Sequence, residues 1–269
     1  MSNTPHSLPS CEALRVEVIA PHILLVTMNR PQVLNAIDRE MGQCLHDLVM
    51  HLAIDPGELR AVVLTGAGRA FCTGADLRAR AGQTLEEQAA QHRMAERSYE
   101  ARLESPLPWI AAVSGACYAG GLEAALTCDF IYADRSARFA FTECRLGFMP
   151  GCMGTQTLPR AIGERRAKEL IMTGESFDGE QALQWGLVNR LCETGTVLDE
   201  AMACAARIAA CAPLAVRQVK KSVHFGLQTD LHTAYRYELE AWYALMHTED
   251  RREGIRAFVE KRPAVFTGR

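Results

Sequence analysis

The chain has 269 residues, of which 48% are apolar and 23% charged, and its formal net charge at pH 7 is −3. These values are typical of a globular protein with a sizeable core, and they argue against a nucleic-acid groove or an anionic membrane as the main partner. The ten cysteines form no CxxC pair and the eight histidines no HxxxH pattern, so we expect reduced thiols and no metal site. Residues 1–10 form a polar tail without a signal-peptide core, and no apolar run reaches membrane-spanning length. A cytoplasmic protein is therefore expected.

The first third of the chain predicts two strands, a helix and a third strand. Residues 14–19 and 23–28 are rich in β-branched and apolar residues and are joined by Ala20-Pro21-His22, which indicates a hairpin. Asp38 is placed to cap a helix, because apolar residues recur at helical spacing from there to Asp55-Pro56-Gly57. A short apolar strand at 61–64 follows.

The middle of the chain continues the alternation of strands and helices. We predict strands at 109–113, 130–133 and 139–141, and helices at 78–104 and 121–127. This order favours an α/β fold over a helical bundle. Residues 197–260 carry helical periodicity with almost no strand signal, and they are too few to bury a core alone. We therefore expect a core at 1–195 and a helical region at 196–269 that packs on the core or on another subunit.

The stretch from Ser114 to Gly154 holds the strongest indication of chemistry. Gly120-Gly121 opens a predicted helix, and the first N–H groups of a helix have no intrahelical partner and carry partial positive charge. Such a terminus suits an anion or a carbonyl oxygen that becomes an oxyanion. A second donor is needed, and the small-residue loop Gly74-Ala75 supplies one at the Ala75 N–H.

Two acids accompany these loops. Glu123 lies between Leu122 and Ala124-Ala125, where an unpaired charge would be costly, and Glu143 follows twenty positions later. Buried carboxylates that share a site push their pKa values apart, so that one gives a proton and the other takes one. That arrangement suits the movement of water across a double bond. The spacing leaves open a buried structural role for Glu123 and a surface cap for Glu143.

Six blocks of sequence give the chain a family resemblance over nearly its whole length. The blocks are NRPQVLNAID (29–38), LTGAGRAFCTGADL (64–77), SGACYAGGLEAALTCD (114–129), FTECRLGFMPGCMGTQTLPRAIG (141–163), AKELIMTGESFDGEQALQWGLVNRL (167–191) and AFVEKRPAVFTGR (257–269). In these blocks the chain resembles the crotonase, or enoyl-CoA hydratase/isomerase, superfamily. The resemblance implies a spiral of ββα units followed by a C-terminal helical region that mediates trimers, commonly paired into hexamers.

The resemblance also implies the activity. The substrate would be a 2-enoyl thioester of coenzyme A, with no permanently bound cofactor, and the N–H groups of Ala75 and Gly120 would form the oxyanion hole. Glu123 and Glu143 match the two catalytic glutamates of hydratases, whereas isomerases generally retain only the second. Both acids together argue for hydration to 3-hydroxyacyl-CoA. Glu123 would orient and deprotonate the water, and Glu143 would protonate the α-carbon.

Binding residues follow from the same motifs. Arg30, Arg78 and Lys261 are candidates for contacts with the coenzyme A phosphates, the last by its likeness to a family position near the C-terminus. The chain departs from the family pattern at Cys152-Met153, where a small Ala-Gly pair is usual, and the bulk of Met153 is expected to narrow or reshape the pocket. We expect the acyl tunnel to be shaped by residues 78–104 and by three further side chains, Trp109, Phe148 and Met149.

The sequence also bears on several rival functions. Gly66-Ala67-Gly68 follows a strand, but Phe71 replaces the last glycine of a dinucleotide-binding motif. Cys72 and Cys117 lie beside the proposed donors, yet neither motif contains a histidine to activate a thiol. An RNA-binding role is disfavoured because residues 78–104 contain no lysine. An enoyl-CoA isomerase, a thioester hydrolase and a hydratase for branched or glutaconyl-type chains stay open as alternatives.

Overall fold

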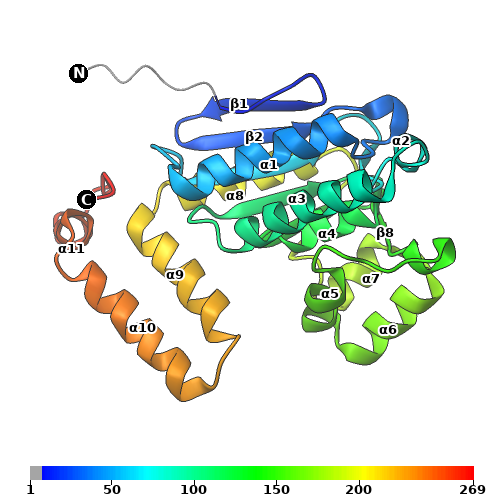
Figure 1. The fold of residues 1–269 in the computed structure, drawn as a ribbon. Helices are drawn as coiled ribbons and strands as arrows, with labels where there is room; N and C mark the ends of the chain where they lie inside the picture. Colours follow the sequence, from blue (N-terminus) through cyan, green and yellow to red (C-terminus); the bar gives the residue numbers. More distant parts are fainter. Residues whose placement is uncertain (1–7) are drawn as a thin grey trace.

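The computed structural model describes residues 8–269, so most of the tail predicted over residues 1–10 lies outside it. A six-stranded sheet and a smaller four-stranded sheet carry helices on their faces, and further helices follow at the C-terminal end (Figure 1). The predicted α/β class is confirmed. No helix within the described residues is both long enough and apolar enough to cross a membrane.

The larger sheet is mostly parallel. In spatial order its strands are β1 (Leu14–Ala20), β2 (Ile23–Met28), β3 (Ala61–Gly66), β5 (Trp109–Val113), β7 (Phe130–Asp134) and β10 (Arg190–Cys192). β1 and β2 form the predicted antiparallel hairpin, with Leu14 opposite Met28, and the other neighbours are parallel. The smaller sheet has the order β4 (Ala70–Cys72), β6 (Ala116–Tyr118), β8 (Arg138–Ala140) and β9 (Phe177–Asp178).

Both faces of the central strands β2, β3, β5 and β7 are buried, which explains why these strands are mostly apolar rather than alternating, whereas the edge strand β1 is largely exposed. On β3, Val62 and Leu64 join the core on one face, whereas Ala61 and Val63 join the core on the other. The second face is covered by α8 (Val197–Ala209). The helical region predicted from residue 196 therefore begins with a helix that packs on the sheet.

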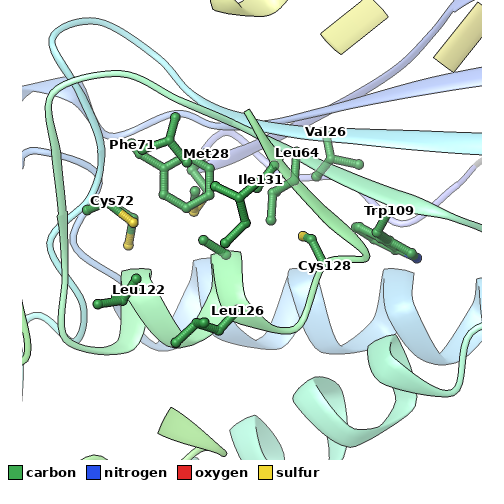
Figure 2. Close-up of a cluster of buried hydrophobic side chains, with 14 of the residues drawn as sticks. Val26, Met28, Leu64, Phe71, Cys72, Trp109, Leu122, Leu126, Cys128 and Ile131 are labelled. Carbon is green, nitrogen blue, oxygen red and sulfur yellow. The ribbon is translucent and has the colours of Figure 1, made fainter. Parts of the chain in front are cut away.

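Two of the helices that share the first core with the strands are α1 (Arg39–Ile54) and α4 (Gly120–Leu126), and α3 (Leu85–Leu103) packs against this core through the partly buried Ala101. α1 is capped as predicted, because the Asp38 side chain accepts a hydrogen bond from the Met41 N–H at 2.9 Å. Figure 2 shows Leu122 and Leu126 of α4 gathered with strand residues such as Leu64. Burial of these apolar side chains fixes the position of α4, whose first residue is Gly120.

The helix predicted over residues 78–104 is two helices. α2 (Leu77–Arg80) ends at a turn, and α3 begins only at Leu85. The Thr84 side chain accepts a hydrogen bond from the Glu87 N–H, and the Glu87 carboxylate accepts one from the Thr84 N–H. This reciprocal pair is a capping box, which starts a new helix and prevents the chain from continuing α2 into α3.

The remaining helices are short or lie toward the C-terminus. They are η1 (Pro31–Val33), η2 (Glu143–Leu146), α5 (Gly154–Ile162), α6 (Glu164–Thr173), α7 (Gly179–Gln184), α9 (Pro213–Gly226), α10 (Leu231–Leu245) and α11 (Glu249–Glu260). α9 and α10 extend away from the sheets as an arm (Figure 1). Val223, Leu227 and Trp242 on this arm are exposed, so the apolar faces that the sequence indicated are uncovered in a single chain.

Candidate active site

A cavity of about 770 Å³ lies beside α1, α3 and α4 and is also lined by the segment 142–152. Its volume is in the range of small-molecule sites. Four of the predicted site residues line it, namely Ala75, Gly120, Glu123 and Glu143. They come from three separate loops and helices, so the fold brings together residues that are up to 68 positions apart in sequence.

The two predicted oxyanion donors lie at the same end of this cavity. Gly120 is the first residue of α4, so its N–H has no intrahelical acceptor. The Ala75 N–H donates to no acceptor among residues 8–269. The loop and the helix start are in direct contact, because a Cβ built on Gly74 would lie 2.9 Å from the Gly120 nitrogen. This close approach, at a glycine with φ of +88°, leaves no room for a side chain between the two donors.

Glu123 is held one turn into α4 and is only 4% exposed. Its Oε1 accepts hydrogen bonds from the backbone N–H of Cys152 at 2.7 Å and of Gly154 at 3.0 Å. Burial raises the pKa of Glu123 to about 7, the two N–H donors offset part of that effect, and the neighbouring Glu143 raises the pKa further. A carboxyl with a pKa near neutrality is suited to exchange protons at physiological pH.

Glu143 opens η2 and is also 4% exposed, so it is not a surface cap. Burial raises the pKa of its carboxyl as well, with partial compensation from nearby backbone N–H groups. Its Oε2 is buried and finds no hydrogen-bond partner among the described residues. An unsatisfied buried oxygen is costly, so this atom is expected to meet a water or a ligand in the cavity.

Tyr99 is a site residue that none of the sequence motifs singles out. Its hydroxyl donates to the Gly120 carbonyl oxygen at 2.8 Å, and its ring lines the cavity. One turn later on α3, the buried Arg102 donates to the Ala124 carbonyl oxygen at 2.9 Å. The two side chains together fix α4 near both of its ends. The sequence signal was a tyrosine and an arginine at helical spacing in an otherwise polar helix.

The predicted contacts for coenzyme A are placed differently. Arg30 forms ion pairs with Asp38 at 3.2 Å and with Asp76 at 3.0 Å, so its charge is engaged within the loop. Arg78 is exposed on α2 and does not line the cavity, although Leu77 and Arg80 of the same helix do. Lys261 follows α11, which lies at the opposite end of the molecule from α2 (Figure 1). Lys261 therefore does not reach the cavity of its own chain.

The expected acyl-tunnel residues are partly corrected. Phe148, Met149 and Cys152 line the cavity. Trp109 does not, because it is fully buried in β5 as part of the main core. Met153 does not line the cavity either. It precedes α5 in a left-handed conformation with φ of 76°, a backbone geometry that usually requires glycine. The predicted narrowing by Met153 is therefore wrong.

The thiols near the donors are poor nucleophile candidates. Cys72 and Cys117 are both fully buried. Burial raises the pKa of the Cys72 thiol to about 12 and that of Cys117 well above its ordinary value. Because the thiolate is the reactive form, both side chains are expected to be inert at neutral pH.

Comparisons with known proteins agree with this geometry. The family model described as enoyl-CoA hydratase/isomerase matches residues 19–269. The chain is 41% identical to a putative enoyl-CoA hydratase/isomerase, YngF, of Bacillus subtilis, with 92% of this chain and 95% of that protein covered. It is 37% identical to (E)-benzylidenesuccinyl-CoA hydratase of Thauera aromatica, with coverage of 93% and 97%.

A solved structure confirms the expected fold. The enoyl-CoA hydratase of Bacillus anthracis superposes with a TM-score of 0.93 at 38% identity and covers 96% of this chain and 100% of its own. The predicted crotonase fold with C-terminal helices is thus confirmed. On the family model, the relatives and the fold together, the chain belongs to the enoyl-CoA hydratase/isomerase family, the crotonase superfamily.

Proposed function

We propose that the protein hydrates a 2-enoyl-CoA thioester to the 3-hydroxyacyl-CoA. The observation that carries this proposal is the pair of buried acids on one cavity, Glu123 and Glu143, beside the N–H groups of Ala75 and Gly120. Each acid has only part of its hydrogen-bonding capacity used within the described chain. The remaining carboxyl oxygens are suited to hold one water between them.

The proposed chemistry is divided between the two N–H donors and the two acids. The Ala75 and Gly120 N–H groups polarise the thioester carbonyl, which makes the β-carbon electrophilic and stabilises the enolate that forms when water adds. Glu123 takes a proton from the water as its oxygen bonds to the β-carbon. Glu143 gives a proton to the α-carbon. Glu123 then ends protonated and Glu143 ionised, and proton exchange between them through solvent restores the starting state.

The proposal is tested with crotonyl-CoA and with two variants, each of which replaces a different glutamate by glutamine. The purified protein is expected to consume the enoyl thioester and to yield 3-hydroxybutyryl-CoA, identified by mass spectrometry. Glu143→Gln should lower kcat by ~10²- to 10⁴-fold, which is typical of losing a general acid. Glu175→Gln is the matched control, because Glu175 is exposed and its side chain has no partner in residues 8–269. Near-normal hydration by Glu143→Gln would refute the assignment, and rapid double-bond migration without hydration would favour an isomerase.

We also propose that the protein assembles as a homotrimer or a homohexamer. Support comes from the exposed apolar side chains of the C-terminal arm, including Val223, Leu227 and Trp242. An exposed apolar patch of this kind on a helical arm is typical of a subunit interface. Arg78, exposed beside the cavity, is proposed to meet a coenzyme A phosphate. Sedimentation that shows only a 29.6 kDa monomer would contradict the assembly.

A further inference from the structure

One charged side chain in the cavity has no role in the proposed hydration. Arg80, the last residue of α2, is the only arginine or lysine that lines the cavity within residues 8–269. Its guanidinium makes no ion pair and no hydrogen bond to any described residue. Arg30 differs in this respect, because its guanidinium is neutralised by Asp38 and Asp76.

Arg80 belongs to a polar corner beside the catalytic acids. Its positive charge acts on the thiol of Cys152, whose backbone N–H donates to Glu123 at 2.7 Å. α3 supplies the polar neighbours in the cavity wall. Gln91 carries a buried Oε1 without a partner among the described residues, and the His92 Nδ1 lies 3.9 Å from the Cys152 sulfur. An alkyl chain would satisfy none of these groups.

Arg80 has no acidic partner at this corner. The carboxylate of Glu96 lies 3.1 Å from the His92 Nε2 and forms no ion pair with Arg80, although Glu96 and Arg80 act on the Cys152 thiol in opposite directions. Neither Glu123 nor Glu143 forms an ion pair with Arg80. An arginine that is partly shielded from water gains most from a carboxylate, which its planar guanidinium can bind through two hydrogen bonds.

We propose that Arg80 selects enoyl-CoA substrates whose acyl chain carries a second carboxylate, with Arg80 binding that carboxylate. The inference rests on the proposed hydratase activity, which it deepens by naming the class of substrate. The Gln91 side-chain amide lines the same cavity and can contribute a hydrogen bond. Arg80 acts as a specificity residue, since it touches the substrate away from the carbons that react.

The test compares two enoyl esters that share coenzyme A and differ in charge. Crotonyl-CoA has a methyl end, and glutaconyl-CoA has a carboxylate end. Arg80→Met is expected to lower kcat/KM for glutaconyl-CoA by ~10- to 100-fold, because a hydrogen bond to a charged group is lost. The kcat/KM for crotonyl-CoA should stay within about threefold of the wild-type value. Arg80→Lys should restore part of the loss. Arg93→Met, an exposed change on α3, should alter neither ester.

Measurements of ligand binding distinguish this inference from the hydratase proposal. The saturated esters glutaryl-CoA and butyryl-CoA cannot be hydrated, so their calorimetric Kd values do not depend on catalysis. Wild type should bind glutaryl-CoA more tightly, and Arg80→Met should abolish the preference. Equal weakening for both esters would show that Arg80 holds the coenzyme A part, and unchanged Kd values would show that it holds neither; either result overturns the inference. If neither enoyl ester is hydrated but the binding preference is intact, the hydratase proposal alone is refuted.

Discussion

Replacement of Glu123 by glutamine is expected to separate activity from stability. Burial raises the pKa of this carboxyl from 4.5 to about 7. Between these values the folded protein holds a proton that the unfolded chain has released, so the free energy of unfolding falls as pH rises. At about 1.4 kcal/mol per pKa unit, the ionised carboxylate costs the fold about 3 kcal/mol above pH 7. Below pH 4.5 this cost is absent.

Glutamine keeps the acceptor and removes the charge. Its Oε1 can accept the same hydrogen bonds from the Cys152 and Gly154 N–H groups, at the positions where they now lie 2.7 and 3.0 Å from the carboxylate. Glu123→Gln should therefore unfold with a free energy up to about 3 kcal/mol higher than wild type at pH 8, and nearly equal to it at pH 4.5. Hydration of crotonyl-CoA should nevertheless fall by ~10²- to 10⁴-fold.

The assay is urea denaturation at both pH values and equal protein concentration, with initial hydration rates on the same samples. Glu175→Gln, at an exposed position, controls for the general effect of losing a negative charge. A Glu123→Gln protein that is less stable than wild type at pH 8 would refute the assignment of a buried, costly charge. Retention of more than a tenth of the wild-type activity would refute its role as the base.

Three further outcomes are expected. Wild-type kcat/KM should rise as pH increases through about 7, because the buried base must lose its proton, and a flat profile would contradict this. Gly121→Ala should lower the Tm strongly while Gly82→Ala does not, since only the first would place a Cβ 2.2 Å from a backbone oxygen, that of Cys72. Tyr99→Phe should lower kcat by up to ~10-fold with little change in KM, because the Gly120 carbonyl loses its donor; an altered KM alone would argue against a positioning role.

Local patterns predicted much of the fold. The hairpin at residues 14–28 and the helix capped by Asp38 depend on neighbours within a few positions, and both are observed. The break between α2 and α3 was missed, although Thr84 and Glu87 form a capping box that the sequence displays. The polar composition of residues 78–104 concealed this start signal within a longer helical pattern.

The candidate site was predicted only as far as its motifs extend. The fold places several motifs at the edge of one cavity, and these motifs carry Ala75, Gly120, Glu123 and Glu143. Partners that are distant in sequence were not predictable. The backbone N–H of Cys152 that holds Glu123 comes from a loop 29 positions away, and no local pattern indicates that contact.

Other contacts were unpredictable for the same reason. Arg30, a candidate for phosphate binding, forms ion pairs with Asp38 and with Asp76, which lies 46 positions further on, and no local pattern indicates the second pair. Trp109 stands in a strand that is buried on both faces, so its ring enters the core instead of the cavity. Burial on both faces depends on which helices cover the sheet, and this is a property of the whole fold.

The most direct test of the central claim is a double-mutant cycle on crotonyl-CoA hydration. If Glu123 and Glu143 act on one water, either change to glutamine removes most of the rate, and the double variant should be only slightly slower than the slower single variant. Losses that multiply, so that the double variant falls by the product of the two single effects, would show that the two acids act independently and would contradict the account.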